Sequence, residues 1–132
     1  MTHTDYFDSL RKQSYIALST FRRNGDAVVT PVWFTQNTDR LYVWTDQDSG
    51  KVKRIRNNPL VRLAPSTFAG KPVGDEIAGV ARLLEVEVGQ DVLPLFETKY
   101  GVQFKFFNWL SKRQGHDGHI IVEITSSDVE GL

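Results

Sequence analysis

The sequence predicts a mainly β domain in which antiparallel strands form a barrel flanked by helices. Short runs rich in β-branched and aromatic residues follow one another along the chain, and turn residues separate them. One short basic helix interrupts these runs, and no regular alternation of strand and helix is present. Successive strands joined by hairpin turns favour an antiparallel barrel over a parallel sheet built from βαβ units.

Length and composition predict one domain, residues 1–132. The chain has 132 residues, of which 40% are hydrophobic and 24% charged, as is typical of a globular domain with an ordinary core. The formal net charge is zero, so no global field attracts nucleic acid. The chain has no cysteine, which excludes disulfides, a thiolate nucleophile and a cysteine–zinc site.

The sequence predicts no membrane partner. No apolar run approaches the roughly 18–20 residues of a membrane-spanning helix, and the start MTHTDYFDSL is unlike a signal peptide. We therefore expect a cytoplasmic protein.

The first half of the chain predicts a helix and four strands. A turn after the first strand contains Asn24 and Gly25, which both tolerate positive φ and signal a hairpin. Pro31 removes one ladder donor from the second strand, so either the partner strand's acceptor is free there or the strand lies at a sheet edge or barrel mouth. The expected elements are a helix from about Asp5 to Gln13, with Tyr6, Phe7 and Leu10 buried, and strands Tyr15–Phe21, Ala27–Thr35, Arg40–Thr45 and Leu60–Pro65.

A short helix is expected between the third and fourth strands. Ser49 is a good N-cap, and Gly50 leaves room for close approach of the backbone. Val52 and Ile55 form a narrow apolar stripe, and Pro59 disfavours helix at the residue before it. The helix is therefore predicted to run for about two turns.

The first turn of this helix carries an unusual charge. Lys51 and Lys53 have the wrong sign for the positive end of a helix dipole, at a cost of about 0.3–1 kcal/mol each. A bound phosphate would reverse that sign, because helix N-termini collect anions and charge-assisted hydrogen bonds contribute about 1.5–3 kcal/mol each. The alternative is a solvated basic face, with Asp46 and Asp48 supplying counter-charge.

The second half predicts a loop, two strands and an aromatic helical segment. The loop Ser66–Glu76 is long enough to form a mobile lip, the strand Ala78–Val88 follows it, and Gly118–Thr125 closes the domain. Between them, apolar residues fall at helical spacing on either side of Gly101: Val92, Leu93, Phe96 and Tyr100 before it, and Phe104, Phe107 and Leu110 after it, with Phe106 and Trp109 as a second stripe. A helix that is apolar on two sides must be covered on two sides. One side can face the barrel, and the other either faces a second subunit or belongs to ordinary core packing.

Three segments carry a family resemblance. The runs TPVWF at 30–34, LYVWT at 41–45 and SGKVKRIRNNP at 49–59 resemble the pyridoxamine-phosphate-oxidase-like split β-barrel superfamily. The resemblance is closer to its flavin/deazaflavin oxidoreductase branch, whose members are predicted to use coenzyme F-420, and it extends from about Tyr15 to Thr125. It implies an FMN-binding-like split barrel and a two-fold homodimer with the cofactor at the interface.

The resemblance also implies a set of cofactor-binding residues. The phosphate would be held by residues around the start of the basic helix, namely Thr45, Ser49, Gly50 and Lys51, with Lys53 and Arg54 as weaker candidates. The ring system would lie along the strand that contains Thr30, Pro31, Val32 and Trp33, and Trp109 of the second subunit would complete the pocket. Trp33 and Trp44 are also interpreted as barrel residues rather than as stacking partners for nucleic-acid bases.

The expected function is hydride transfer from a reduced deazaflavin to an unsaturated or carbonyl-conjugated small molecule. The sequence shows no evident catalytic acid, base or nucleophile, which is consistent with chemistry carried by a cofactor. An FMN-dependent enzyme of the pyridoxamine-phosphate-oxidase type is the alternative, although the C-terminal Trp and Arg substrate positions of that type are missing. A non-catalytic barrel that binds a flavin, a lipid-like molecule or a tetrapyrrole is a further alternative. The histidines of the run 116–119 indicate a turn around Asp117-Gly118 rather than a metal site.

Overall fold

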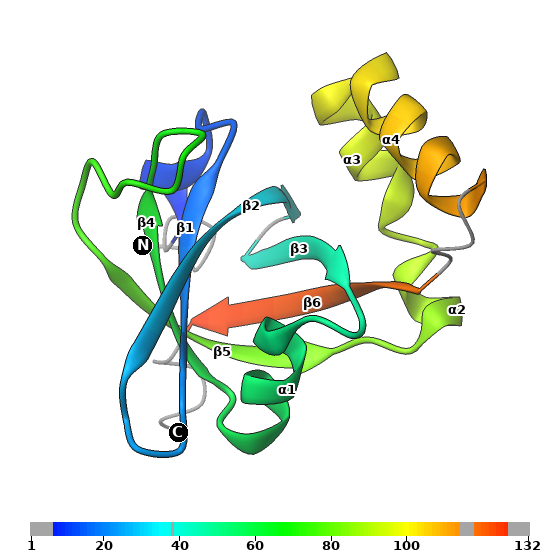
Figure 1. The fold of residues 1–132 in the computed structure, drawn as a ribbon. Helices are drawn as coiled ribbons and strands as arrows, with labels where there is room; N and C mark the ends of the chain where they lie inside the picture. The colour runs from blue at the N-terminus through cyan, green and yellow to red at the C-terminus, as the bar shows by residue number, and fades with distance from the viewer. Residues whose placement is uncertain (1–6, 38, 114–117, 127–132) are drawn as a thin grey trace.

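Six antiparallel strands form a closed barrel in the computed structural model, which describes residues 7–37, 39–113 and 118–126. The strand order around the barrel is β1-β2-β3-β6-β5-β4 (Figure 1). This confirms the predicted fold class. The strands are β1 Ile16–Phe21, β2 Ala27–Asn37, β3 Arg40–Asp46, β4 Leu60–Pro65, β5 Ile77–Leu83 and β6 His119–Ser126.

The long strand β2 changes partner halfway along its length. Its first part pairs with β1 as far as Val32, which faces Ile16, and its second part pairs with β3 from Trp33, which faces Trp44. Pro31 lies just before this change, and no β3 residue pairs with it along its other edge. The missing amide of Pro31 therefore falls at the mouth that the sequence predicted.

The barrel interior holds the larger of two apolar clusters, which contains Phe34, Val43, Leu63 and Ile124. Phe7 and Leu10 close one end of it and are almost fully buried, as predicted. A short 3-10 helix, Asp8–Leu10, follows Phe7 in place of the longer helix expected from Asp5 to Gln13. Because side chains three residues apart eclipse in a 3-10 turn, this turn directs Phe7 and Leu10 to the same side. Tyr6 lies outside the described residues.

The basic helix forms as predicted. Helix α1 covers Gly50–Asn57, and the Ser49 hydroxyl accepts a hydrogen bond from the amide of Val52 at 3.4 Å. Val52 and Ile55 are buried, and α1 packs against β1 and β5. The apolar stripe thus anchors the helix against the barrel.

The strand predicted at Ala78–Val88 is wrong in its second half. β5 ends at Leu83, and a short helix, α2, covers Val86–Gly89. The amide of Leu84 still donates to the carbonyl of Ile121 in β6 at 3.0 Å, but its side chain packs into a second apolar cluster with Val92 and Phe96. The alternating pattern continues in the sequence, but the burial of Leu84 outside the barrel overrides it.

Two further helices form an arm beside the barrel (Figure 1). Helix α3 covers Leu93–Tyr100 and α4 covers Val102–Arg113, and Gly101, with φ 66°, separates them as predicted. Phe96 and Phe104 are fully buried in the second cluster. In the described ranges, no helix is long and apolar enough to span a membrane.

Candidate aromatic pocket

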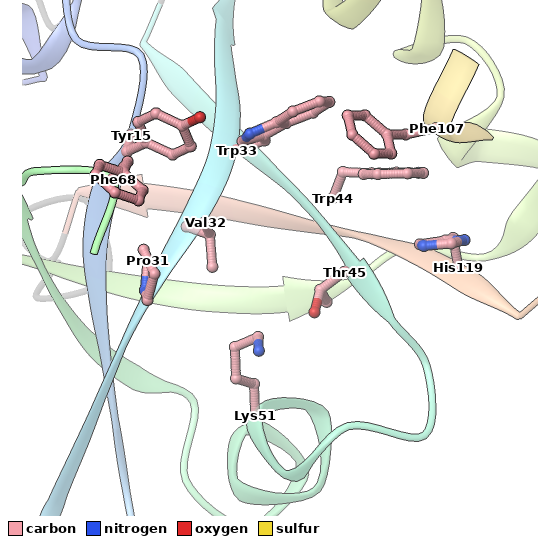
Figure 2. A pocket seen from close by; sticks show the side chains of 10 residues that line it. All are labelled: Tyr15, Pro31, Val32, Trp33, Trp44, Thr45, Lys51, Phe68, Phe107 and His119. Carbon is pink, nitrogen blue, oxygen red and sulfur yellow. The ribbon is translucent and has the colours of Figure 1, made fainter. Parts of the chain in front are cut away.

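A pocket of about 350 Å³ opens beside the point where β2 changes partner (Figure 2). Trp33 and Trp44, which face each other across β2 and β3, contribute stacked rings whose centroids lie 6.0 Å apart. Phe107 of α4 meets Trp33 edge-on, with centroids 5.6 Å apart and an interplanar angle of 74°. Figure 2 shows Tyr15 and Phe68 on one side of Trp33, with Trp44 and Phe107 on the other. Aromatic side chains from five segments therefore line a site for a flat ring.

The floor of the pocket is polar and cationic. Thr45, at the end of β3, is only 8% exposed, and Lys51 comes from the first turn of α1. Figure 2 shows the Lys51 side chain pointing from α1 toward Val32 and Thr45. In the part of the chain that the structure describes, Lys51 has no ion pair. The floor thus offers a half-buried ammonium group that an anionic ligand would neutralise.

The electrostatic surroundings of Lys51 favour such a ligand. Burial lowers the pKa of Lys51, the neighbouring Arg54 guanidinium lowers it further, and Asp46 raises it. Both lowering effects mean that the charged ammonium is less stable here than in water. An anion at the pocket floor would relieve both effects.

The other cations of α1 lie away from the pocket. Arg54 donates from Nε to the Thr20 hydroxyl at 2.7 Å, and Lys53 is exposed. A Cβ on Gly50 would lie 2.7 Å from Nη1 of Arg54, so the space at Gly50 is taken by that guanidinium. Burial lowers the pKa of Arg54, and Arg22 lowers it further. The structure therefore brings Lys51 to the cavity and directs Arg54 toward β1.

Some of the predicted site residues line the pocket and others do not. Pro31, Val32 and Trp33 line the pocket as expected, together with Thr45 and Lys51. Ser49, Gly50, Lys53, Arg54, Thr30 and Trp109 do not line it. Ser49 uses its hydroxyl for the helix cap, and Trp109 is 53% exposed on α4. Thr30 has the one buried side-chain polar atom, among those described, that lacks a hydrogen-bond partner.

Five lining residues were not among the predicted site residues: Tyr15, Trp44, Phe68, Phe107 and His119. Trp44 could have been found, because the hairpin register places it opposite Trp33. Phe68 comes from the loop between β4 and β5, and Phe107 comes from α4. No local pattern in the sequence relates those two segments to β2.

His119 begins β6, within the strand predicted at Gly118–Thr125, and borders the pocket, which the sequence did not predict (Figure 2). Its ring stacks on Trp44 with centroids 4.0 Å apart and planes inclined by 7°, and its Nε2 lies 3.3 Å from Oδ1 of Asp46. His116 and Asp117 lie outside the described residues. Within those residues, no group of three or more His, Asp or Glu side chains could hold a metal ion.

The residues present fit the ring and phosphate of a flavin-type cofactor. The aromatic side chains match a planar ring system, and Lys51 and Thr45 match a phosphate as cation and hydroxyl donor. Residues of β2 that the sequence placed along the ring border the same cavity as the predicted phosphate-binding lysine. The cavity volume lies within the range of small-molecule and cofactor sites, which is about 300–1,000 Å³.

Comparisons with solved structures give the same fold. A conserved hypothetical protein from Mycobacterium tuberculosis is 18% identical, with a TM-score of 0.69 over 96% of this chain and 81% of that one. The heme storage protein HutZ from Vibrio cholerae is 14% identical, with a TM-score of 0.67 over 96% and 91% of the two chains. A structure described as F420 reductase is 19% identical, with a TM-score of 0.56 over 91% of each chain.

Family membership rests on a match over nearly the whole chain. No curated protein matches this sequence significantly. The profile of the family described as pyridoxamine 5'-phosphate oxidase, in contrast, matches residues 3–132. The chain therefore belongs to the pyridoxamine 5'-phosphate oxidase family, whose split-barrel fold it shares.

Proposed function

We propose that this protein is an oxidoreductase that uses a deazaflavin, coenzyme F-420, to transfer hydride to an unsaturated or carbonyl-conjugated small molecule. The observation that carries the proposal is the pocket itself, where aromatic rings border one cavity with Lys51, which has no ion pair among the described residues. Family membership and the structural similarity to an F420 reductase support a flavin-type ligand.

The chain's own residues would divide the work of binding. Lys51 would hold the phosphate by charge and Thr45 by its hydroxyl, while Trp33 and the backbone at Pro31 and Val32 would orient the ring. Phe68 would exclude water from the outer side of the pocket. When bound, the cofactor supplies the hydride, so the protein needs to contribute orientation and a low-dielectric surrounding.

We propose further that the active unit is a homodimer with the cofactor at the interface. Phe106 and Trp109 on α4 are 55% and 53% exposed, and their ring centroids lie 6.3 Å apart. Exposed apolar groups of this kind commonly mark an interface. Phe107 connects this surface to the pocket, because it lies between Trp33 and Phe106 in a chain of ring contacts. In a dimer, Trp109 would then complete the pocket of the partner subunit.

Two alternatives concern the ligand. FMN has the same ring shape and a phosphate, so the lining residues suit it equally well. A tetrapyrrole is the second alternative, and His119 favours it because imidazole is a common iron ligand that here borders the cavity. HutZ, a similar structure, is described as a heme storage protein.

Titration of the purified protein with coenzyme F-420, FMN and haem tests the proposal. We expect micromolar or tighter binding of the deazaflavin, followed by its oxidation when a conjugated acceptor is added. Yellow colour and flavin fluorescence in the freshly purified protein would instead support FMN, and a haem absorption band would support the tetrapyrrole. Tight binding without turnover against a broad panel of acceptors would indicate a carrier.

A further inference from the structure

One tyrosine hydroxyl lies between strand β2 and the segment that precedes β1. Tyr100, the last residue of α3, accepts a hydrogen bond from the amide of Phe34 at 2.9 Å. Its oxygen also lies 3.0 Å from the carbonyl oxygen of Phe34 and 2.9 Å from that of Ser14, so its one proton is available to either carbonyl. One side-chain atom thus contacts backbone groups of both the segment before β1 and β2.

The register of the sheet explains this position. Ile16 faces Val32 in the β1–β2 ladder, and two residues further along Ser14 would face Phe34. Alternate facing pairs of an antiparallel ladder exchange two hydrogen bonds directly. At Ser14 and Phe34 the Tyr100 hydroxyl stands between the two backbones instead. The hydroxyl therefore occupies the place of the next ladder pair, at the point where β2 changes partner.

The same side chain contacts the wall of the pocket. The Tyr100 ring stacks on Trp33 with centroids 4.6 Å apart and planes inclined by 12°. Trp33 precedes Phe34, so Tyr100 holds both one face of the indole and the backbone next to it. Trp33 in turn stacks on Trp44 across the pocket wall.

We infer that Tyr100 is a positioning residue, which sets the Trp33 ring for a planar ligand by keeping the Ser14–Phe34 ladder pair open. Without the hydroxyl, the carbonyl oxygen of Ser14 can accept from the amide of Phe34 directly, because both groups lie 2.9 Å from the same Tyr100 oxygen. That closure would draw the residue next to Trp33 toward β1. The inference about ligand binding rests on the proposed function, whereas the effect on Trp33 does not.

Tyr100→Phe tests the inference, because it keeps the ring and removes only the hydroxyl. Tyr42→Phe is the matched control, since Tyr42 is a buried tyrosine that does not line the pocket. Near-ultraviolet circular dichroism of the ligand-free protein reports the coupled Trp33–Trp44 pair. We expect Tyr100→Phe to change this signal and Tyr42→Phe to leave it as in the wild type. The affinity for coenzyme F-420 or FMN should fall about three- to tenfold in Tyr100→Phe alone.

An unchanged tryptophan signal in folded Tyr100→Phe would overturn the inference, whatever the affinity. If the wild type binds neither coenzyme, the proposed function fails, and the tryptophan signal still decides the role of Tyr100. If Tyr100→Phe does not fold, amide hydrogen exchange of the wild-type protein tests the inference instead. Protection of the Phe34 amide comparable to that of Val32 supports the bridging hydroxyl, and exchange as fast as at an open strand edge overturns it.

Discussion

Lys51 and Lys53 carry the same charge in the same helical turn, but the fold places them in different surroundings. Both lie in the first turn of α1, yet Lys51 lines the pocket and Lys53 is exposed. The buried apolar stripe of Val52 and Ile55 fixes the rotation of the helix and so decides which lysine faces the cavity. The direction of each side chain therefore determines the expected effect of replacing it.

Lys51→Ala should weaken binding of coenzyme F-420 or FMN by about 10- to 150-fold, equivalent to about 1.5–3 kcal/mol for one charge-assisted hydrogen bond. Removing a positive charge from a helix N-terminus should not lower the free energy of unfolding. Isothermal titration and urea denaturation measure the two quantities. Lys53→Ala is the control and should keep the wild-type affinity. Equal affinities for the two variants would contradict the phosphate role of Lys51.

Lys99 leads to a prediction about pH. Its Nζ lies 3.3 Å from the centroid of the Phe34 ring, and burial lowers its pKa from 10.5 to about 8. Between these values the unfolded chain binds more protons than the folded one, so this residue's contribution to stability rises with pH from about 8 to 10.5. Below pH 8 its buried charge opposes folding by at most about 3 kcal/mol, and the cation–π contact offsets about 0.5–2 kcal/mol of that.

Lys99→Met should therefore be more stable than the wild type at pH 7, by about 1 kcal/mol. That advantage should shrink as the pH rises from 8 to 10.5. Urea denaturation of both proteins across this range measures the difference, and Lys105→Met, at an exposed position of α4, controls for the loss of a lysine. A difference that stays constant or grows with pH would be inconsistent with a buried charge at Lys99.

At the scale of elements, the loop between β4 and β5 is attached to the pocket strand. The turn within it is closed by backbone hydrogen bonds between Thr67 and Gly70 and between Thr67 and Lys71. A Cβ on Gly70 would lie 2.9 Å from Cδ of Pro31. Phe68 thus reaches the pocket from a turn that packs on β2, although the sequence predicted only a mobile lip.

Gly70→Ala and Gly25→Ala form a matched pair that tests this packing. Both glycines have a positive φ, of 94° and 95°, but a Cβ on Gly25 would meet nothing within 4 Å. Gly25→Ala should cost about 1–2 kcal/mol of unfolding free energy through backbone strain alone. Gly70→Ala should cost at least about 1 kcal/mol more, because the new methyl group overlaps Pro31. Equal losses of unfolding free energy in the two variants would show that the loop can move away from Pro31 at no energetic cost.

At the scale of the whole molecule, the two apolar clusters join the barrel and the helices, but one apolar side of α4 stays exposed. The barrel cluster is closed by Phe7 and Leu10, and the second cluster joins α3 and α4 to the barrel through Phe96 and Phe104. On α4 the opposite side remains exposed at Phe106 and Trp109. A dimer of standard interface size, about 800 Å² per partner, would cover such a face.

Sedimentation equilibrium at micromolar concentration should therefore give the mass of two chains. Trp109→Glu should shift it toward one chain and lower the affinity for the coenzyme, because it places a charge in the apolar interface. Gln103→Glu, an exposed polar position of the same helix, should leave both the mass and the affinity unchanged. A wild-type protein that sediments as a monomer would contradict the proposed dimer.

Several elements were predictable because their causes are local. The Asn24-Gly25 turn, the Ser49 cap and the break at Gly101 each depend on neighbouring residues and lie where the sequence predicted them. The end of β5 at Leu83 was not predictable, since Leu84 packs outside the barrel against residues that come later in the chain. In the site, Lys51 and the Pro31–Trp33 segment were found by family resemblance, whereas Phe68 and His119 come from distant segments.

The sequence by itself determined the strands, the hairpin order and the basic helix, because periodicity, turn residues and caps act within a few residues of one another. The tertiary structure decided which of those residues share a cavity, because strand register and helix rotation are set by burial across the whole chain. The Tyr100 hydroxyl between Ser14 and Phe34 is the clearest case, since its partners lie 86 and 66 residues away in the chain.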